Sequence, residues 1–179
     1  MKKKQIAFSV ITTYLWVIMI LLGSILLETF MIYPNIFRSV PESFKTALEF
    51  MSVTGPAQFF RPLGYLCWLC AAGALVVGWH VKSARYWILG SVIMIACEGM
   101  ASIIFFWPRN TILFVEGTAL HSVDFLRQTA NEFQLWHWSR LAFNAAAAVL
   151  IFIGFLKFYR YRIIAQRASH ETPLSVSTE

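Results

Sequence analysis

Charged residues are scarce in this chain. Only 13% of its 179 residues are charged and 58% are hydrophobic, whereas a typical soluble domain carries about twice that charged fraction. Between Lys4 and Glu28 there is no charged residue at all. A run of about 20 apolar residues is what one helix needs to cross a bilayer. The composition therefore excludes an ordinary soluble domain and predicts an integral membrane protein.

Cysteine is rare as well, and several familiar motifs are missing. The three cysteines are too few to define a disulfide framework. The chain has none of the Glu-x-x-His pairs that hold two metal ions in di-iron helix bundles. Its basic residues flank apolar runs and form no nucleic-acid-binding motif, so the net charge of +6 does not indicate a nucleic-acid partner.

Four apolar segments predict four membrane-spanning helices, at about residues 6–30, 62–82, 86–107 and 136–157. The third segment is interrupted only by Glu98, and the fourth reaches full length only if it includes Arg140. The first is longer than a signal peptide's apolar core and is not followed by an A-x-A-like site, so we expect it to be retained. The predicted fold class is all-α, an integral membrane four-helix bundle that forms one domain over residues 1–160.

The basic residues predict the orientation, because Lys and Arg collect on the cytoplasmic side of a membrane. With four spans, the two tails and the turn between the second and third spans share one side. That side carries nine of the fifteen basic residues and only two acidic ones, Glu171 and Glu179. We therefore expect a multi-pass protein of the cell (inner) membrane with cytoplasmic N and C termini, and residues 161–179 as a polar cytoplasmic tail whose last part, from Ser169, is disordered.

The connections on the opposite side hold most of the irregular sequence. "VPESFKTALEFMSVTG" places Phe44, Leu48 and Met51 at helical spacing after Pro41, which predicts an amphipathic helix in the first outer loop. In the second outer loop, "RNTILFVEG" is expected to be a short extended segment. In the following segment, "HSVDFLRQTANEF", Val123, Leu126, Ala130 and Phe133 keep a helical period and predict an extension that runs straight into the fourth span.

Ionisable and amide side chains inside the spans are the candidates for chemistry. In the bilayer such groups are costly and face the bundle interior or a cavity, so each is by default a hypothesis of function. His137, Arg140 and Asn144 recur at spacings of three and four and share one side of a helix. By depth, Glu98 and Glu28 belong to the same outer half of the membrane. These five residues predict an outward-facing polar pocket.

Two uses of this set compete. Imidazole and carboxylate ligands suit iron, copper or zinc, so His137, Glu98 and Glu28 are candidate ligands of a single transition metal. Alternatively, Glu98 and Arg140 neutralise one another as a buried pair and Asn144 completes their hydrogen bonds. For His137, between Trp136 and Trp138, the simpler interpretation is an interfacial residue in an aromatic belt. The sequence leaves the cofactor open between one metal ion and none.

Cys67 and Cys70 form a C-x-x-C in the second span, which is also found in quinone-linked membrane thiol oxidoreductases. That mechanism needs further cysteines for exchange, and only Cys97 remains, so packing of small residues between helices is the simpler interpretation. His80 lies at the other end of the second span, too far from His137 for the two to bind one haem.

Two segments, "LETFMIYPNIFRSVPESF" and "LWHWSRLAFNAAAAVLIF", resemble stretches of a family of small four-helix membrane proteins of unknown function that includes the anthrone oxygenases. The matching residues are Glu28, Pro34, Asn35, Phe37, Arg38, His137, Trp138 and Arg140, while Ile36 stands where an aromatic residue is more usual. The resemblance implies an oxygenase-like or redox activity on a hydrophobic, polycyclic or quinonoid substrate. It does not settle the cofactor.

The functional hypothesis is therefore a membrane-embedded enzyme for a lipophilic aromatic or quinone-like molecule that enters from the bilayer. His137 would be general base or metal ligand, with Glu98 and Glu28 as its partners, and Arg140 and Asn144 would stabilise an enolate. The competing hypothesis is a non-catalytic binder, carrier or accessory subunit. Homo-oligomerisation and membership of a larger membrane complex both stay open. The catalytic hypothesis requires a cavity that reaches the polar side chains. The non-catalytic hypothesis predicts that Glu98 and Arg140 form a closed ion pair that water does not reach.

Overall fold

The computed structural model describes residues 2–171, with side chains described for residues 3–167. This part contains no strand. It contains four helices long and apolar enough to cross a membrane: Lys3–Ile36, Pro56–Gly78, Arg85–Leu120 and Val123–Arg167. The prediction of an all-α fold with four helices of spanning length and hydropathy is confirmed in the described residues.

The helical rods are built from shorter elements joined end to end. In chain order these are α1 (Lys2–Leu27), the π-helical turn η1 (Glu28–Ile32), α2 (Tyr33–Ile36), α3 (Glu42–Phe50), α4 (Pro56–Gly78), α5 (Arg85–Ala101), the π-helical turn η2 (Ser102–Phe106), α6 (Trp107–Thr111), the π-helical turn η3 (Ile112–Glu116), α7 (Gly117–Leu120) and α8 (Val123–Glu171).

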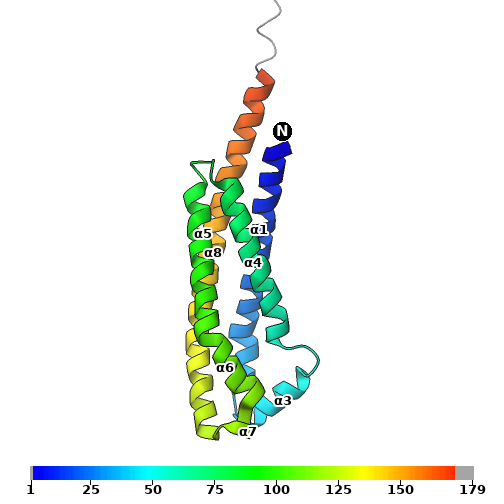
Figure 1. The fold of residues 1–179 in the computed structure, drawn as a ribbon, viewed down its shortest axis with the longest axis vertical. Coiled ribbons are helices and arrows are strands. Elements are labelled where there is room, and N and C mark those ends of the chain that lie inside the picture. Colours follow the sequence, from blue (N-terminus) through cyan, green and yellow to red (C-terminus); the bar gives the residue numbers. More distant parts are fainter. Residues whose placement is uncertain (1, 172–179) are drawn as a thin grey trace, which may run out of the picture.

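The four rods run alternately up and down. α1 packs on α4 and α8, and α5 packs on the same two helices, so the rods form a closed ring. α1 begins and α8 ends at one end of the bundle, which we call the terminal end (Figure 1). The loop end, opposite, carries α3, α6 and α7. α8 has 49 residues, roughly 70 Å at 1.5 Å per residue, and extends past the other rods at the terminal end.

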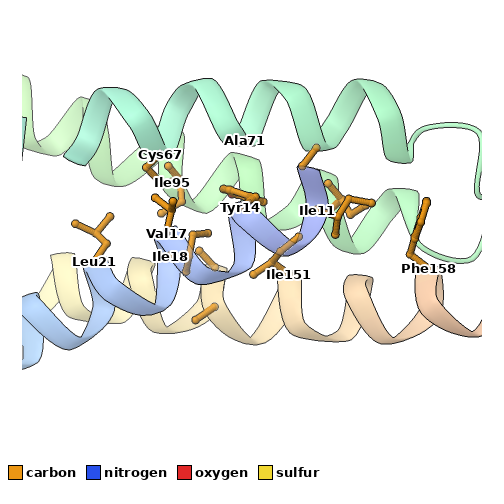
Figure 2. Close-up of a cluster of buried hydrophobic side chains, with 14 of the residues drawn as sticks. Ile11, Tyr14, Val17, Ile18, Leu21, Cys67, Ala71, Ile95, Ile151 and Phe158 are labelled. Carbon is orange, nitrogen blue, oxygen red and sulfur yellow. The ribbon is translucent and has the colours of Figure 1, made fainter. Parts of the chain in front are cut away.

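The core between the rods is narrow and mostly apolar. Residues of α1 at helical spacing, from Ile11 to Leu21, point toward the other three rods, where they meet small side chains such as Ala71 (Figure 2). Two hydrogen bonds cross this core. Ser91 donates to the Ala147 carbonyl at 2.9 Å, so Tyr14 must be the donor in its 3.0 Å bond to Ser91. Small residues let the helices approach closely, as is common in membrane bundles.

Two π-helical turns occur just before prolines. The Tyr33 N–H bonds the Glu28 carbonyl in η1, and the Trp107 N–H bonds the Ser102 carbonyl in η2, each across five residues. Pro34 and Pro108 follow directly and supply no N–H of their own. The helices accommodate the lost donors by widening locally, a common feature of functional sites.

A second apolar cluster closes the loop end. Phe44 of α3 packs against Phe37 and Phe114 at ring-centroid distances of 6.1 and 5.4 Å. Phe133 of α8 lies in the same cluster. Arg127 donates to the Val40 carbonyl at 3.0 Å and ties α8 to the loop that precedes α3. The helix that the hydrophobic pattern predicted in this loop thus lies across the end of the bundle.

Three boundaries differ from the sequence-based expectation. Residues 109–117 were expected to be extended, and this was wrong, because they lie in α6, η3 and the start of α7. α4 begins at Pro56 rather than near residue 62, so Pro62 lies inside the helix. Membrane helices tolerate an internal proline where neighbouring groups satisfy the freed backbone groups. α8 continues to Glu171, so the first residues of the predicted polar tail are helical. Residues 172–179, most of the segment expected to be disordered, lie outside the described residues.

The closest approach of α4 and α5 gives a test of this packing. A Cβ atom at Gly99 would overlap the indole ring of Trp68, whereas one at Gly23 would meet nothing. We expect Gly99→Ala to lower the free energy of unfolding by about 1–3 kcal/mol and Gly23→Ala to leave it nearly unchanged. Unfolding in mixed micelles, followed by circular dichroism, measures both. Equal stability of the two variants would contradict the packing of α4 on α5.

Candidate functional site

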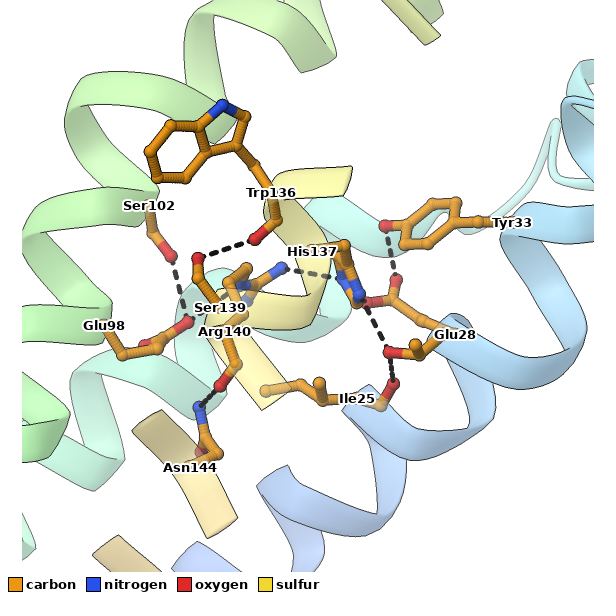
Figure 3. A network of polar contacts seen from close by, with 11 residues as sticks. Ile25, Glu28, Tyr33, Glu98, Ser102, Trp136, His137, Ser139, Arg140 and Asn144 are labelled. Carbon is orange, nitrogen blue, oxygen red and sulfur yellow. Dashed lines mark hydrogen bonds and ion pairs between the residues drawn. The ribbon is translucent and has the colours of Figure 1, made fainter. Parts of the chain in front are cut away.

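The polar side chains predicted from the sequence meet near the loop end of the core. They come from η1, α5 and α8 (Figure 3). All five are less than one-tenth exposed: Glu28, Glu98, His137, Arg140 and Asn144. α4 contributes no charged side chain to the network and forms an apolar wall beside it.

Arg140 is the centre of this network. Its Nε donates to Oε1 of Glu98 at 2.8 Å, and Ser102 donates to the same oxygen at 3.0 Å. The other carboxylate oxygen, Oε2 of Glu98, makes no hydrogen bond among the described residues. The Arg140 guanidinium also lies 5.1 and 5.5 Å from the ring centroids of Phe106 and Phe60. A charge in an apolar bundle thus has one anionic partner and two aromatic faces.

The tautomer of His137 follows from its neighbours. Thr29 gives its hydroxyl hydrogen to the Ile25 carbonyl at 2.7 Å, so the 2.9 Å contact between Thr29 and His137 Nδ1 requires Nδ1 to be the donor. Nε2 then lies 3.3 Å from Oε2 of Glu28 and 3.5 Å from Nη1 of Arg140. Oε2 of Glu28 makes no well-oriented hydrogen bond. Nε2 therefore faces a cation on one side and an acceptor on the other.

The network contains one more carboxylate than guanidinium. Glu28 and Glu98 stand against Arg140, while Tyr33 is a neutral donor to Oε1 of Glu28 at 2.9 Å. An uncompensated carboxylate is costly in an apolar interior, so Glu28 depends on its contacts with Tyr33 and His137.

Asn144 does not take the place expected for it. Its amide donates to the Arg140 carbonyl at 3.2 Å, within α8, and its Oδ1 is buried without a partner. Ser102, rather than Asn144, supplies the second hydrogen bond to Glu98. The interpretation of His137 as an interfacial residue is wrong, because its side chain is 1% exposed, whereas Trp136 and Trp138 on either side are about half exposed.

Three participants were missed by sequence reasoning: Thr29, Tyr33 and Ser102. Ser102 stands four residues after Glu98, one helical turn away, and that spacing was available in the sequence. Thr29 directly follows Glu28. Tyr33 lies five residues after Glu28, and only the π-helical turn brings its hydroxyl back to that carboxylate. These three side chains are neutral, so they do not stand out in the sequence as charged residues in an apolar run do. Their hydrogen-bond partners in the structure identify them as part of the network.

The three candidate metal ligands do not converge on one point. Among the side chains of residues 3–167, no group of three His, Cys, Asp or Glu residues has the geometry to hold a metal ion. Glu98 is bound to Arg140, whose guanidinium also contacts His137. A cation between two intended ligands opposes a second cation, so the residues do not fit a site formed by His137, Glu98 and Glu28.

The other sequence candidates lie away from the network. Cys67 and Cys70 are free, and Cys67 is fully buried in the apolar core, without the access that thiol exchange needs. His80 lies at the terminal end of α4, near the rings of Phe158 and Tyr161. His121 pairs with Glu116 at 2.6 Å at the loop end.

A groove between α4 and α5 reaches Glu98 and Arg140. This α4/α5 groove is lined mainly by residues of the two helices, with Tyr65 and Trp68 on one side and Ser102 on the other, and its volume is about 50 Å³. A smaller cavity of about 30 Å³ lies on the loop-end side of Arg140. His137 lines neither space. The charged side chains that line the groove are Glu98, Arg140 and Arg61.

No protein-family model, curated protein or solved structure matches this chain. The resemblance to the family of the anthrone oxygenases therefore rests on the motifs around Glu28 and His137.

The buried ion pair makes a prediction for stability. Arg140→Met leaves the Glu98 carboxylate without a counterion in the core, so we expect a loss of about 3–5 kcal/mol in the free energy of unfolding. The double variant Arg140→Met with Glu98→Gln removes both charges and should recover much of that loss. Unfolding in mixed micelles measures both, with the exposed Arg38→Met as control. A double variant no more stable than the single one would show that the pair is not what stabilises this region.

Proposed function

We propose that this protein is a membrane enzyme that removes a proton from a lipophilic, oxygen-bearing aromatic or quinone-like molecule and stabilises the resulting enolate. The observation that carries the proposal is the pair formed by Glu98 and Arg140, which lines the α4/α5 groove with an acceptor and a cation side by side. Among the described residues, Oε1 of Glu98 accepts both of its hydrogen bonds, and Oε2 is the candidate base. Arg140 is the candidate partner of the substrate oxygen.

His137 takes a different role here from the one the sequence suggested. It lies behind Arg140 and touches neither the groove nor the small cavity, so it is a positioning residue. Its Nε2 lies 3.5 Å from Nη1 of Arg140 and 3.3 Å from Oε2 of Glu28. A proton that Glu98 accepts adds to this network, and a negative charge on the bound enolate compensates it.

The overall reaction follows the resemblance to oxygenases. A C–H proton leaves to the carboxylate, the C–H electron pair passes into the enolate, and the enolate can react with dioxygen as co-reactant. For a CH₂ group flanked by aromatic rings, one dioxygen then gives one carbonyl and one water. Only the proton removal is derived from residues of this chain.

A second candidate function is a non-catalytic membrane protein, either a binder or carrier or an accessory subunit. Two observations favour it. The Glu98 and Arg140 pair is closed at 2.8 Å, and the groove's volume of about 50 Å³ is well below the ~300 Å³ or more of an ordinary ligand site. A polycyclic substrate requires α4 to move away from α5.

The two functions are separated by exchange of the acidic C–H with solvent. Anthrone in D₂O is incubated with the protein in lipid nanodiscs without dioxygen, and deuterium incorporation is followed by mass spectrometry. We expect Glu98→Gln to reduce the enzyme-dependent exchange rate by about 10²–10⁴-fold, the usual contribution of a general base. Glu49→Gln, which removes an exposed carboxylate at the loop end, is the matched control. Exchange no faster than in empty nanodiscs would favour the non-catalytic function.

We also propose that the terminal end faces the cytoplasm of a cell membrane. The support is the excess of Lys and Arg in the tails and in the turn between α4 and α5. Alkaline phosphatase inserted after residue 52 should be active, and green fluorescent protein fused to the C terminus should fluoresce. The opposite pattern would reverse the orientation.

A further inference from the structure

A pocket at the loop end has no role in the proton-transfer proposal. This loop-end pocket lies between α3, the start of α4, and α6 with η3, and its volume is about 200 Å³. Its walls are mostly apolar, and Leu48, Met51 and Phe114 are among them. Arg61 is the one charged residue that lines it.

Arg61 is a cation without an anionic partner. Among the described residues it makes no ion pair and no hydrogen bond, and its guanidinium lies 5.5 Å from the ring of Trp107. It lines three spaces: the loop-end pocket, the small cavity beside Arg140 and the α4/α5 groove. Glu98 is the one acidic residue that lines any of the three, and it is bound to Arg140. Positive charge is therefore in excess along the whole series of spaces.

The three spaces are neighbours with shared walls. Pro56, Ala57, Arg61 and Asn110 line both the loop-end pocket and the small cavity. Arg61, Trp107 and Arg140 line both the small cavity and the groove. The loop-end pocket thus adjoins the buried pair by way of Arg61 and Trp107.

Asn110 supplies a second polar group in the shared wall. Its Oδ1 is buried and has no hydrogen-bond partner among the side chains and backbone that the structure describes. An unpaired buried acceptor is costly, and a ligand hydroxyl in either cavity would satisfy it. The wall therefore offers a cation for an anionic oxygen and an acceptor for a hydroxyl.

We propose that the loop-end pocket binds an acidic lipophile, an apolar body with an anionic oxygen group, whose anionic group binds Arg61. The inference rests on the proposed function, because it identifies this class of molecule as the substrate of the Glu98 and Arg140 pair. Asn110 accepts a hydrogen bond from a hydroxyl on the same molecule. Arg61 is an exposed residue beside mostly apolar walls, and an excess of positive charge along such a cleft favours anions over neutral molecules of the same shape.

The test compares small probes that differ in charge. Binding of 2-naphthoate, 6-hydroxy-2-naphthoate, laurate and the neutral 2-naphthalenemethanol to protein in zwitterionic nanodiscs is measured by equilibrium dialysis against empty nanodiscs. We expect the acids to bind more tightly than the neutral alcohol, and the hydroxy acid to bind most tightly. Whether naphthoate or laurate binds better distinguishes an aromatic acid from a fatty acid as the source.

Two variants connect this binding to the pocket. Arg61→Gln should weaken binding of the acids about tenfold and leave the neutral alcohol unchanged. Arg38→Gln removes an exposed positive charge from the same end of the bundle and should change neither. Asn110→Leu should abolish the preference for the hydroxy acid. Equal binding of acid and alcohol to the wild type, or equal losses in the Arg61 and Arg38 variants, would overturn the inference.

Failure of this inference is distinguishable from failure of the proposed function. If binding of the acids depends on Arg61 but no C–H exchange occurs, the acidic ligand is supported and the proposed proton transfer is contradicted. If C–H exchange depends on Glu98 but Arg61→Gln does not change binding of the acids, the proton transfer is supported and the acidic ligand is contradicted.

Discussion

The guanidinium of Arg140 is the constraint on which the polar half of this bundle depends. A permanent cation in an apolar interior must have anionic or aromatic partners close by. Glu98 from α5 and the rings of Phe60 and Phe106 meet that requirement. Because these partners come from α4, α5 and η2, one charge on α8 fixes the relative positions of several elements. The second carboxylate, Glu28, contacts Tyr33 and His137.

The irregular turns of the helices serve the same site. η1 begins at Glu28 and brings the Tyr33 hydroxyl back to that carboxylate, while η2 begins at Ser102, the second donor to Glu98. Both turns lie before prolines that cannot donate an N–H. The irregular turns and the polar network therefore lie in the same part of the bundle. Beyond them, the second apolar cluster, which includes Phe44 and Phe133, closes the loop end.

The available space favours small or flexible ligands in the observed conformation. The groove beside the ion pair is narrow, and Trp68, packed against Gly99, forms part of its wall. The larger space lies at the loop end, next to Arg61. A membrane molecule can approach a carboxylate and a guanidinium here without contacting His137. The ligand that we propose is anionic or enolisable, and the narrow groove limits its size near the pair.

The sequence by itself determined the fold class, because apolar runs of about 20 residues have few alternatives to a membrane helix. Four such runs occur, two of them without any charge and two with a single charged residue each. The sequence also identified five of the buried polar residues, because ionisable and amide side chains inside apolar runs are costly to bury and therefore few. It did not determine which of them touch. Only the tertiary structure showed that Arg140 stands between His137 and Glu98, that Asn144 bonds its own helix, and that Thr29, Tyr33 and Ser102 complete the network. The physical reason is that helix rotation and π-helical turns decide the direction of each side chain, and these depend on packing between helices that are distant in the chain.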